Sequence, residues 1–280
     1  MKISIVTPSV RLEMLPIVAK CLSRQKFRTF EWIIIEPQIY KTLNSSWARE
    51  NFEGLERYEF GSAATGDTYT GWKNDEDDGP TVIFLEDPPK REGDYYRLNG
   101  AWNTAFKKAK GELVVSIVDG LWFPPDLLEK LWIHYKANPK ACVGAIGHQY
   151  DKIENDKPEH QVWRDPRARE DFGSFYEIKP IDLELCIASI PRQAILDVGG
   201  VDEEFDEYAA LSEKEMCLRI DKLGYKFYLD QTIEYRAIKH DRLTKDWDQR
   251  YQQGWFYFDK CLKDIQSGKR LKLNFLDNKV

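Results

Sequence analysis

The sequence predicts a mixed α/β fold with a mostly parallel sheet flanked by helices. Short apolar runs of strand length alternate with helical patterns through the first half of the chain. Apolar residues make up 42% and aromatic residues 13% of the 280 residues, which is enough material for a large core. The order strand, helix, strand implies parallel strands joined by right-handed crossovers.

Four strands are predicted in the first half, at residues 3–6, 32–35, 82–85 and 113–118. Helices are predicted over 12–25 and 98–110, where apolar residues recur every three or four positions, and Gly111 is expected to cap the second helix. The polar stretch 37–80 between these elements is expected to be a long loop with a short helix near 47–52. Its acidic run, residues 75–78, fits a solvated turn.

The second half mixes strands and helices. Strands are predicted at 183–189, 225–229 and 232–237, and helices over 212–223 and 244–265. A further short helix is expected to open at Pro191 and to stop at Gly199. The polar segment 151–171 is expected to be a loop. We therefore expect one mixed α/β domain over residues 1–240, followed by a helical extension over 241–280.

Charge and composition exclude several classes of protein. With 41 basic and 47 acidic side chains the net charge is −6, which is unfavourable for wrapping a nucleic-acid backbone. No apolar run approaches the ~18 residues of a membrane span, so no integral membrane segment is expected. The five cysteines have no zinc-site spacing and are expected to be reduced thiols, which favours a cytoplasmic location.

Polar residues follow the predicted strands at the edge where open α/β sheets bind ligands. They are Thr7, Pro8, Ser9 and Arg11 after the first strand, Glu36 after the second and Asp119 after the fourth. Two carboxylates, hydroxyl groups and an arginine suit a phosphate–sugar ligand with a divalent cation. Asp119 is the sharpest candidate, and the alternative for it is an ordinary turn aspartate before Gly120.

Several blocks of the sequence occur in a telling order: residues 3–9, residues 103–119 followed by Pro124 and Pro125, residues 199–205 and residues 212–219, and finally residues 223–226 and His240. Together they resemble family 2 glycosyltransferases with the GT-A fold. Residues 103–119 are similar to the centre of that family, residues 3–9 to its first strand, and residues 199–205 and 212–219 to its acceptor-side segment. The resemblance implies a Rossmann-like GT-A sheet with a nucleotide-sugar half over 1–123 and an acceptor half over 124–240.

The resemblance also implies roles for matching residues. Thr7, Pro8 and Ser9 would line the donor site, Glu36 would contact the nucleotide base, and Asp119 with His240 would hold Mn²⁺ or Mg²⁺. Arg11, Arg97 and Asn103 would reach the nucleotide, although a solvated arginine is the commoner outcome at Arg97. The family's second metal-binding aspartate is replaced by Leu121, which leaves the cation uncertain. Trp122 is expected to stack on the acceptor sugar.

Two glutamates compete for the role of general base. Ser212 and Glu215 have the spacing of a capping box, which would make Glu215 structural. Glu213 is then the expected base that removes the acceptor proton, and the alternative is that it only complements the helix dipole. His134 and His148 are expected to be core or surface histidines. The aromatic residues of 247–258 fit core or dimer packing better than a sugar platform.

We therefore expect an inverting, metal-assisted glycosyltransferase that uses a nucleotide-sugar, with a UDP-sugar as the first candidate. The alternative is a catalytically degenerate relative that binds a nucleotide or sugar without transferring it. Nucleotidyl transfer is a weaker third hypothesis, because no glycine-rich phosphate loop with a lysine follows the first strand. The acceptor is left open among glycan, small molecule, protein and a modified nucleic-acid base, and so is assembly into a homo-oligomer.

Overall fold

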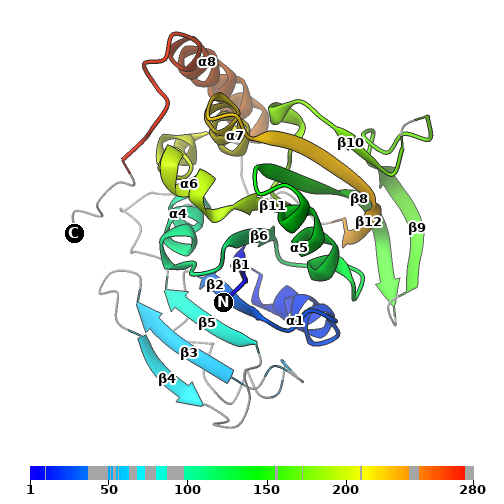
Figure 1. Cartoon of the computed structure of the whole chain (residues 1–280). Helices are drawn as coiled ribbons and strands as arrows, with labels where there is room; N and C mark the ends of the chain where they lie inside the picture. The colour runs from blue at the N-terminus through cyan, green and yellow to red at the C-terminus, as the bar shows by residue number, and fades with distance from the viewer. Residues whose placement is uncertain are drawn as a thin grey trace.

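The computed structural model describes residues 1–9, 11–36, 50, 52, 55, 57–62, 68–72, 80–86, 98–154, 157–171, 173–208, 210–239 and 246–274. Within these ranges the strands form one sheet in the order β10-β12-β8-β11-β6-β1-β2-β5-β3-β4, with β7 paired to β12 and β9 to β8 (Figure 1). The strands are β1 (Ile3–Pro8), β2 (Phe30–Glu36), β3 (Arg57–Ser62), β4 (Thr68–Trp72), β5 (Thr81–Glu86), β6 (Leu113–Ile117), β7 (Leu121–Trp122), β8 (Ala141–Glu154), β9 (Lys157–Arg164), β10 (Phe175–Glu177), β11 (Ile187–Pro191) and β12 (Lys226–Ile238).

Two helical layers cover the sheet (Figure 1). One layer holds α1 (Leu15–Ser23) and α5 (Leu127–Ala137), whose apolar residues share a core with Ile3 and Ile5 of β1. The other holds α4 (Leu98–Lys108), α6 (Arg192–Val198) and α7 (Ser212–Lys222), which share a second core with Val6. Because both faces are buried, the central strands are nearly continuous apolar runs, as parallel strands usually are.

The central strands confirm the predicted parallel arrangement. β1 pairs in parallel with β2 on one side and β6 on the other, and β2 pairs in parallel with β5. β11 runs antiparallel to β6 and β8, so the sheet is mixed in its second half. The carboxyl ends of β1, β2 and β6 therefore lie side by side at one edge.

Two predicted loops are wrong in part. The stretch 37–80 contains β3 and β4, which extend the sheet beyond β5. The segment 151–171 contains the end of β8 and the whole of β9, an exposed antiparallel edge strand. Both regions are too polar to show the apolar runs by which buried strands are predicted. The short helix expected near 47–52 lies mostly outside the described residues.

Two glycines show different reasons for lacking a side chain. Gly199 caps α6 with φ +76, as predicted from the sequence. Gly111 does not cap α4, which ends at Lys108. A Cβ at Gly111 would lie 2.5 Å from the backbone nitrogen of Ser4 and 2.6 Å from the carbonyl carbon of Ile3. Gly111 is therefore required by the close approach of two backbone segments.

The C-terminal helix α8 (Trp247–Gln266) packs against the second half of the chain. Its Phe258 and Cys261 join Phe205 and Leu211 in a small buried cluster, and Tyr251 and Tyr257 pack against it, as predicted. Trp255 and Phe256 of the same helix are 39% and 79% exposed, so the predicted packing role holds for only part of the aromatic series. Beyond the helix, Arg270 Nε donates to Glu215 Oε1 at 2.8 Å. In the part of the chain that the structure describes, no helix is long and apolar enough to cross a membrane.

Candidate functional site

The carboxylate of Asp119 is the centre of a polar cluster at the carboxyl ends of β1 and β6. Ser9 Oγ donates to Asp119 Oδ2 at 3.0 Å, and the backbone nitrogen of Arg11 lies 3.3 Å from the same oxygen. Arg11 Nη1 lies 3.0 Å from Asp119 Oδ1. The side chain of Asp119 is 6% exposed and that of Arg11 18%. Ser9 and Arg11, both predicted to line the donor site, thus contact the Asp119 carboxylate directly.

Thr7 and Pro8 support this edge from within the strand. The hydroxyl of Thr7 donates to the carbonyl of Ile117 at 2.6 Å and accepts a hydrogen bond from Trp32 Nε1 at 2.9 Å. Thr7 is buried, and Pro8 is the last residue of β1. These contacts tie β1 to its neighbours, so Thr7 positions the edge instead of presenting its hydroxyl to a ligand.

The other predicted donor-site residues fall into two groups. Glu36 ends β2 at the same edge, beside Glu86 of β5 in the sheet register, but its side chain lies outside the described residues, as do Arg97 and His240. Asn103 lies in the middle of α4, where its amide donates to the carbonyl of Val201 at 2.9 Å and to Glu203 Oε1 at 2.9 Å. Its Oδ1 accepts from the nitrogen of Val201 at 2.9 Å. The Asn103 amide is therefore engaged in joining α4 to the loop after α6.

Glu213 lies in the first turn of α7 and is half-buried, and its carboxylate accepts a weak hydrogen bond from Ser212 Oγ at 3.5 Å. Burial raises the pKa of Glu213, although Lys214 acts in the opposite direction. A carboxylate whose pKa is raised accepts a proton more readily than an ordinary exposed glutamate does.

Cys186 is a neighbour both of the residue before Asp119 and of Glu213. The backbone nitrogen of Val118, next to Asp119, donates to the carbonyl of Cys186 at 3.1 Å. Burial raises the pKa of the Cys186 thiol to about 11, and the nearby carboxylates of Glu184 and Glu213 contribute to that shift. The backbone of Cys186 thus contacts the residue next to Asp119, and its thiol is within the electrostatic influence of Glu213.

Glu215 is structural, but the predicted capping box is wrong. Leu211, with φ 82, occupies the position before α7 and makes no side-chain cap, so Ser212 is the first helical residue. The Glu215 carboxylate is 0% exposed and accepts from Arg219 Nε at 2.9 and 3.0 Å and from Arg270 Nε at 2.8 Å. The Glu215 carboxylate is therefore bound by Arg219 and Arg270 and not by the backbone at the start of α7, as a capping box would require.

A second ion cluster beside Glu213 was not predicted. The Arg167 guanidinium donates three hydrogen bonds to the Asp165 carboxylate, of which Nε to Oδ1 is 2.9 Å, and the Arg167 backbone nitrogen donates a fourth. Arg167 Nη2 also lies 3.3 Å from Glu184 Oε2. Burial raises the pKa of Asp165, but the hydrogen bonds from Arg167 outweigh it and the net direction is downward. Both residues lie in the segment that the sequence suggested was a loop, and no local pattern points to their pairing.

Trp122 follows Asp119 by three residues and lies in β7, opposite Arg236 of β12. It is half-buried, and its neighbour Leu121 is packed in the core. Because Leu121 faces the core, the residue at the position of the family's second aspartate has a packing role.

The described residues do not by themselves form a divalent metal site. Among them no group of three or more histidine, cysteine, aspartate or glutamate side chains could hold a metal ion. Asp119 offers one carboxylate, and both of its oxygens already accept from Ser9 or Arg11. Mg²⁺ and Mn²⁺ prefer several oxygen ligands, so a guanidinium at this distance disfavours a cation on Asp119 alone.

Comparisons with known proteins agree on the fold. Residues 90–196 match the family model described as glycosyl transferase family 2. S. aureus TarS 1-349 in complex with UDP-GlcNAc is 14% identical with a TM-score of 0.55, and the match covers 95% of this chain and 66% of that one. The same protein in complex with UDP is 12% identical with a TM-score of 0.55, covering 95% and 65%.

GalNAc-T7 with UDP, GalNAc and Mn²⁺ is 12% identical with a TM-score of 0.56, covering 98% of this chain and 55% of that one. The chain thus spans 55% to 66% of the length of these three structures. No curated protein matches the sequence. Residues 90–196 therefore resemble the family 2 glycosyl transferases, and the mixed sheet of the whole chain is a fold that it shares with TarS and GalNAc-T7.

Proposed function

We propose that the protein transfers a sugar from a nucleotide-sugar to an acceptor hydroxyl, with inversion at the anomeric carbon. The observation that carries this proposal is the cluster of Ser9, Arg11 and Asp119 at the carboxyl edge of the sheet. Glu213, whose charge acts on Cys186 next to this region, supports it. UDP and UDP-GlcNAc in the similar structures make a UDP-sugar the first donor to test.

Arg11 is the residue that we assign to the donor diphosphate. Its guanidinium is oriented by Asp119 and lies at the edge where open α/β sheets bind nucleotides. When the bond from the anomeric carbon to the diphosphate breaks, negative charge grows on the leaving oxygen, and a fixed guanidinium stabilises that charge. In this proposal Ser9 positions Asp119, while Glu36 and Arg97 are candidates for contacts to the nucleoside.

Glu213 is the proposed general base. The acceptor oxygen attacks the anomeric carbon opposite the diphosphate, a new carbon–oxygen bond forms, and the acceptor proton passes to the Glu213 carboxylate. The products are the glycosylated acceptor, the nucleoside diphosphate and a protonated Glu213 that then releases its proton to solvent. A base with a pKa raised by burial accepts this proton more readily than an exposed glutamate.

A Mn²⁺ or Mg²⁺ ion on Asp119 and His240 stays a prediction. Mn²⁺ accompanies UDP in the GalNAc-T7 structure, which supports testing it. The pairing of Asp119 with Arg11 argues against a cation on that carboxylate, and we assign no step to a metal. Donor turnover measured in EDTA and after addition of Mn²⁺ tests this directly.

The alternative is a relative that binds the donor without transferring its sugar, which the core packing of Leu121 and the Arg11–Asp119 pair favour. A transferase would transfer the sugar or hydrolyse the donor, whereas a binding relative would do neither. The test is UDP-sugar turnover together with thermal stability in UDP, GDP and CDP, because a ligand that binds only the folded state raises the melting temperature.

For transfer we expect a UDP-dependent thermal shift and turnover that Glu213→Gln abolishes, while Glu129→Gln on the exposed side of α5 leaves turnover unchanged. A thermal shift with no turnover by the wild type would support the binding relative. No shift with any nucleotide would refute both.

A further inference from the structure

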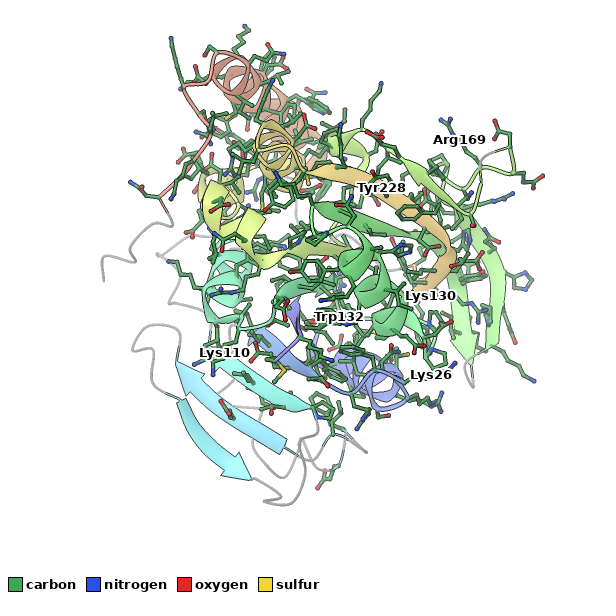
Figure 2. All side chains as sticks on the ribbon, viewed as in Figure 1. Lys26, Lys110, Lys130, Trp132, Arg169 and Tyr228 are labelled. Carbon is green, nitrogen blue, oxygen red and sulfur yellow. The ribbon has the colours of Figure 1, made fainter. Side chains whose placement is uncertain are left out.

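Arg167 fixes the segment that leads into β11. It lies in the loop between β9 and β10, and Figure 2 shows Arg169 of the same loop at the outer end of the sheet. The Nη1 of Arg167 donates to the carbonyl of Asp182 at 2.7 Å, and its Nη2 lies 3.3 Å from Glu184 Oε2. One guanidinium therefore holds both the backbone and a side chain of residues 182–184.

The same segment is also attached to α7. The two leucines of residues 183–185 are buried in one core cluster with apolar residues of α7. Lys214, the residue after Glu213, donates from its Nζ to the carbonyl of Ile181 at 2.9 Å. Because Glu184 lies between the two leucines, these contacts and those of Arg167 hold it near the first turn of α7.

The ion cluster around Arg167 has an excess of negative charge. Arg167 contributes one positive charge, and Asp165 and Glu184 contribute one negative charge each, which leaves −1. The Asp165 side chain is 0% exposed and accepts three hydrogen bonds from the guanidinium, so these two groups neutralise each other closely. The contact to Glu184 is a single one at 3.3 Å, and the Glu184 side chain is 41% exposed. The excess negative charge therefore lies on Glu184.

The charge of Glu184 acts on Glu213. Burial is the largest cause that raises the pKa of Glu213, and the Glu184 carboxylate raises it further, because a like charge nearby favours the protonated form. Cys186 and Tyr235 lie in the same region, and burial raises the pKa of both, that of Cys186 to about 11, so both are neutral at pH 7. The ammonium of Lys214 lowers the pKa of Glu213, and it is the opposing charge on the helix of Glu213 itself.

We propose that Glu184, held in place by Arg167, is a positioning residue that makes the Glu213 carboxylate a stronger base for the acceptor proton. This inference rests on the proposed function, because it takes Glu213 as the base. A base is most effective when its proton affinity suits the working pH, and a fixed negative charge beside it raises that affinity. Glu184 needs no contact with the acceptor for this role.

The first test is a double-mutant cycle of urea unfolding, which needs no turnover. The wild type, Glu184→Gln, Glu213→Gln and the double variant are compared between about pH 4 and pH 8. Because the folded state holds the proton of Glu213 more tightly than the unfolded chain, Glu213→Gln should gain stability over the wild type as pH rises. In the Glu184→Gln background this gain should be smaller, by about twofold or more in the unfolding constant at the upper end of the range. Glu129→Gln, an exposed position of α5 in the other helical layer, is the matched control and should leave the gain unchanged.

The second test is the pH dependence of kcat/KM for turnover of the UDP-sugar. In Glu184→Gln the acid limb of the profile should move to lower pH, and the plateau should fall by about threefold, because the base is weaker. The KM for the donor should stay the same, since Glu184 is assigned no contact with the donor. Glu184→Asp keeps the negative charge and should move the limb less. A purely structural role of Glu184 would lower the rate at every pH and leave the limb in place.

The two tests separate this inference from the proposed function. Turnover by the wild type with an acid limb that Glu184→Gln does not move would overturn the inference and leave the proposed function standing. An equal gain of Glu213→Gln in both backgrounds of the unfolding cycle would overturn it as well. No turnover by the wild type, together with a smaller gain in the Glu184→Gln background, would refute the proposed function and support the effect of Glu184 on Glu213.

Discussion

Two glutamates of α7, only two residues apart, should respond in opposite ways to the same substitution. In Glu215→Gln, the carboxylate that accepts from Arg219 and Arg270 is replaced by an amide that has one acceptor oxygen and a repelling NH₂ group. Both Glu215 and Arg219 are 0% exposed, so the guanidinium cannot turn to water instead. Removing one partner of a buried ion pair costs about 3–5 kcal/mol, and because Gln keeps one acceptor we expect about 3 kcal/mol. That loss corresponds to a fall in melting temperature of roughly 6–12 °C.

Glu213→Gln should leave stability unchanged or raise it at neutral pH. Burial raises the pKa of Glu213 above the ordinary 4.5, so the folded state holds its proton more tightly than the unfolded chain. The wild type therefore loses stability as pH rises from about 4.5 through the raised folded pKa, and the Gln variant lacks this loss. Its advantage should grow with pH over that window.

The assay is urea unfolding followed by circular dichroism for the wild type and both variants, repeated at several pH values. A Glu215→Gln variant within 1 kcal/mol of the wild type would refute the reasoning about the buried pair. A Glu213→Gln variant whose relative stability falls with increasing pH would refute the assignment of a buried carboxyl at that position.

Three other variants test the remaining assignments. Asp119→Asn removes the charge that orients Arg11 and should lower donor turnover by about 100-fold, measured as UDP release, while Ser9→Ala should have a smaller effect. Gly111→Ala should cost about 3 kcal/mol in urea unfolding, because the new Cβ meets backbone atoms of Ser4 and Ile3, whereas Gly173→Ala, with no atom within 4 Å, should be nearly neutral. Asp230→Asn should cost about 1–2 kcal/mol at neutral pH. Burial raises the pKa of Asp230, but hydrogen bonds from His134 and Thr232 outweigh burial, so the pKa is lowered on balance. The difference in stability between wild type and Asp230→Asn should therefore vanish as pH falls below the ordinary 3.8. A difference that stays constant with pH would contradict a stabilising role for the Asp230 carboxylate.

The central sheet could be predicted because its strands are buried on both faces and read as apolar runs. The edge cluster could be predicted in part, since Ser9, Arg11 and Asp119 each follow a strand by one to three residues. The structural role of Glu215 was predicted, but from a capping box that the structure does not contain. Glu215 instead binds Arg270, which is 55 residues away in the sequence, and no local pattern indicates such a contact.

The strands β4 and β9 escaped prediction because they lie at edges of the sheet, where no continuous apolar run is needed. The strand β3 lies between β5 and β4, but its sequence is too polar to be read as a buried strand. Asn103 shows why a polar residue on a helix can be mistaken for a ligand contact. From the sequence it was expected to reach the nucleotide, but its amide is hydrogen-bonded to Val201 and Glu203 in the loop after α6.

The contact of Arg270 with the buried carboxylate of Glu215 has a consequence for how the protein is made. During synthesis α7 leaves the ribosome well before residue 270, so for that interval Glu215 has only Arg219 as a charged partner. Arg270 also pairs with Asp202, so the loop that carries Asp202 gains this ion pair only after residue 270 has been synthesised. We therefore expect the region around α6 and α7 to reach its final packing late in translation, after the strands and helices of the first half of the chain have been synthesised.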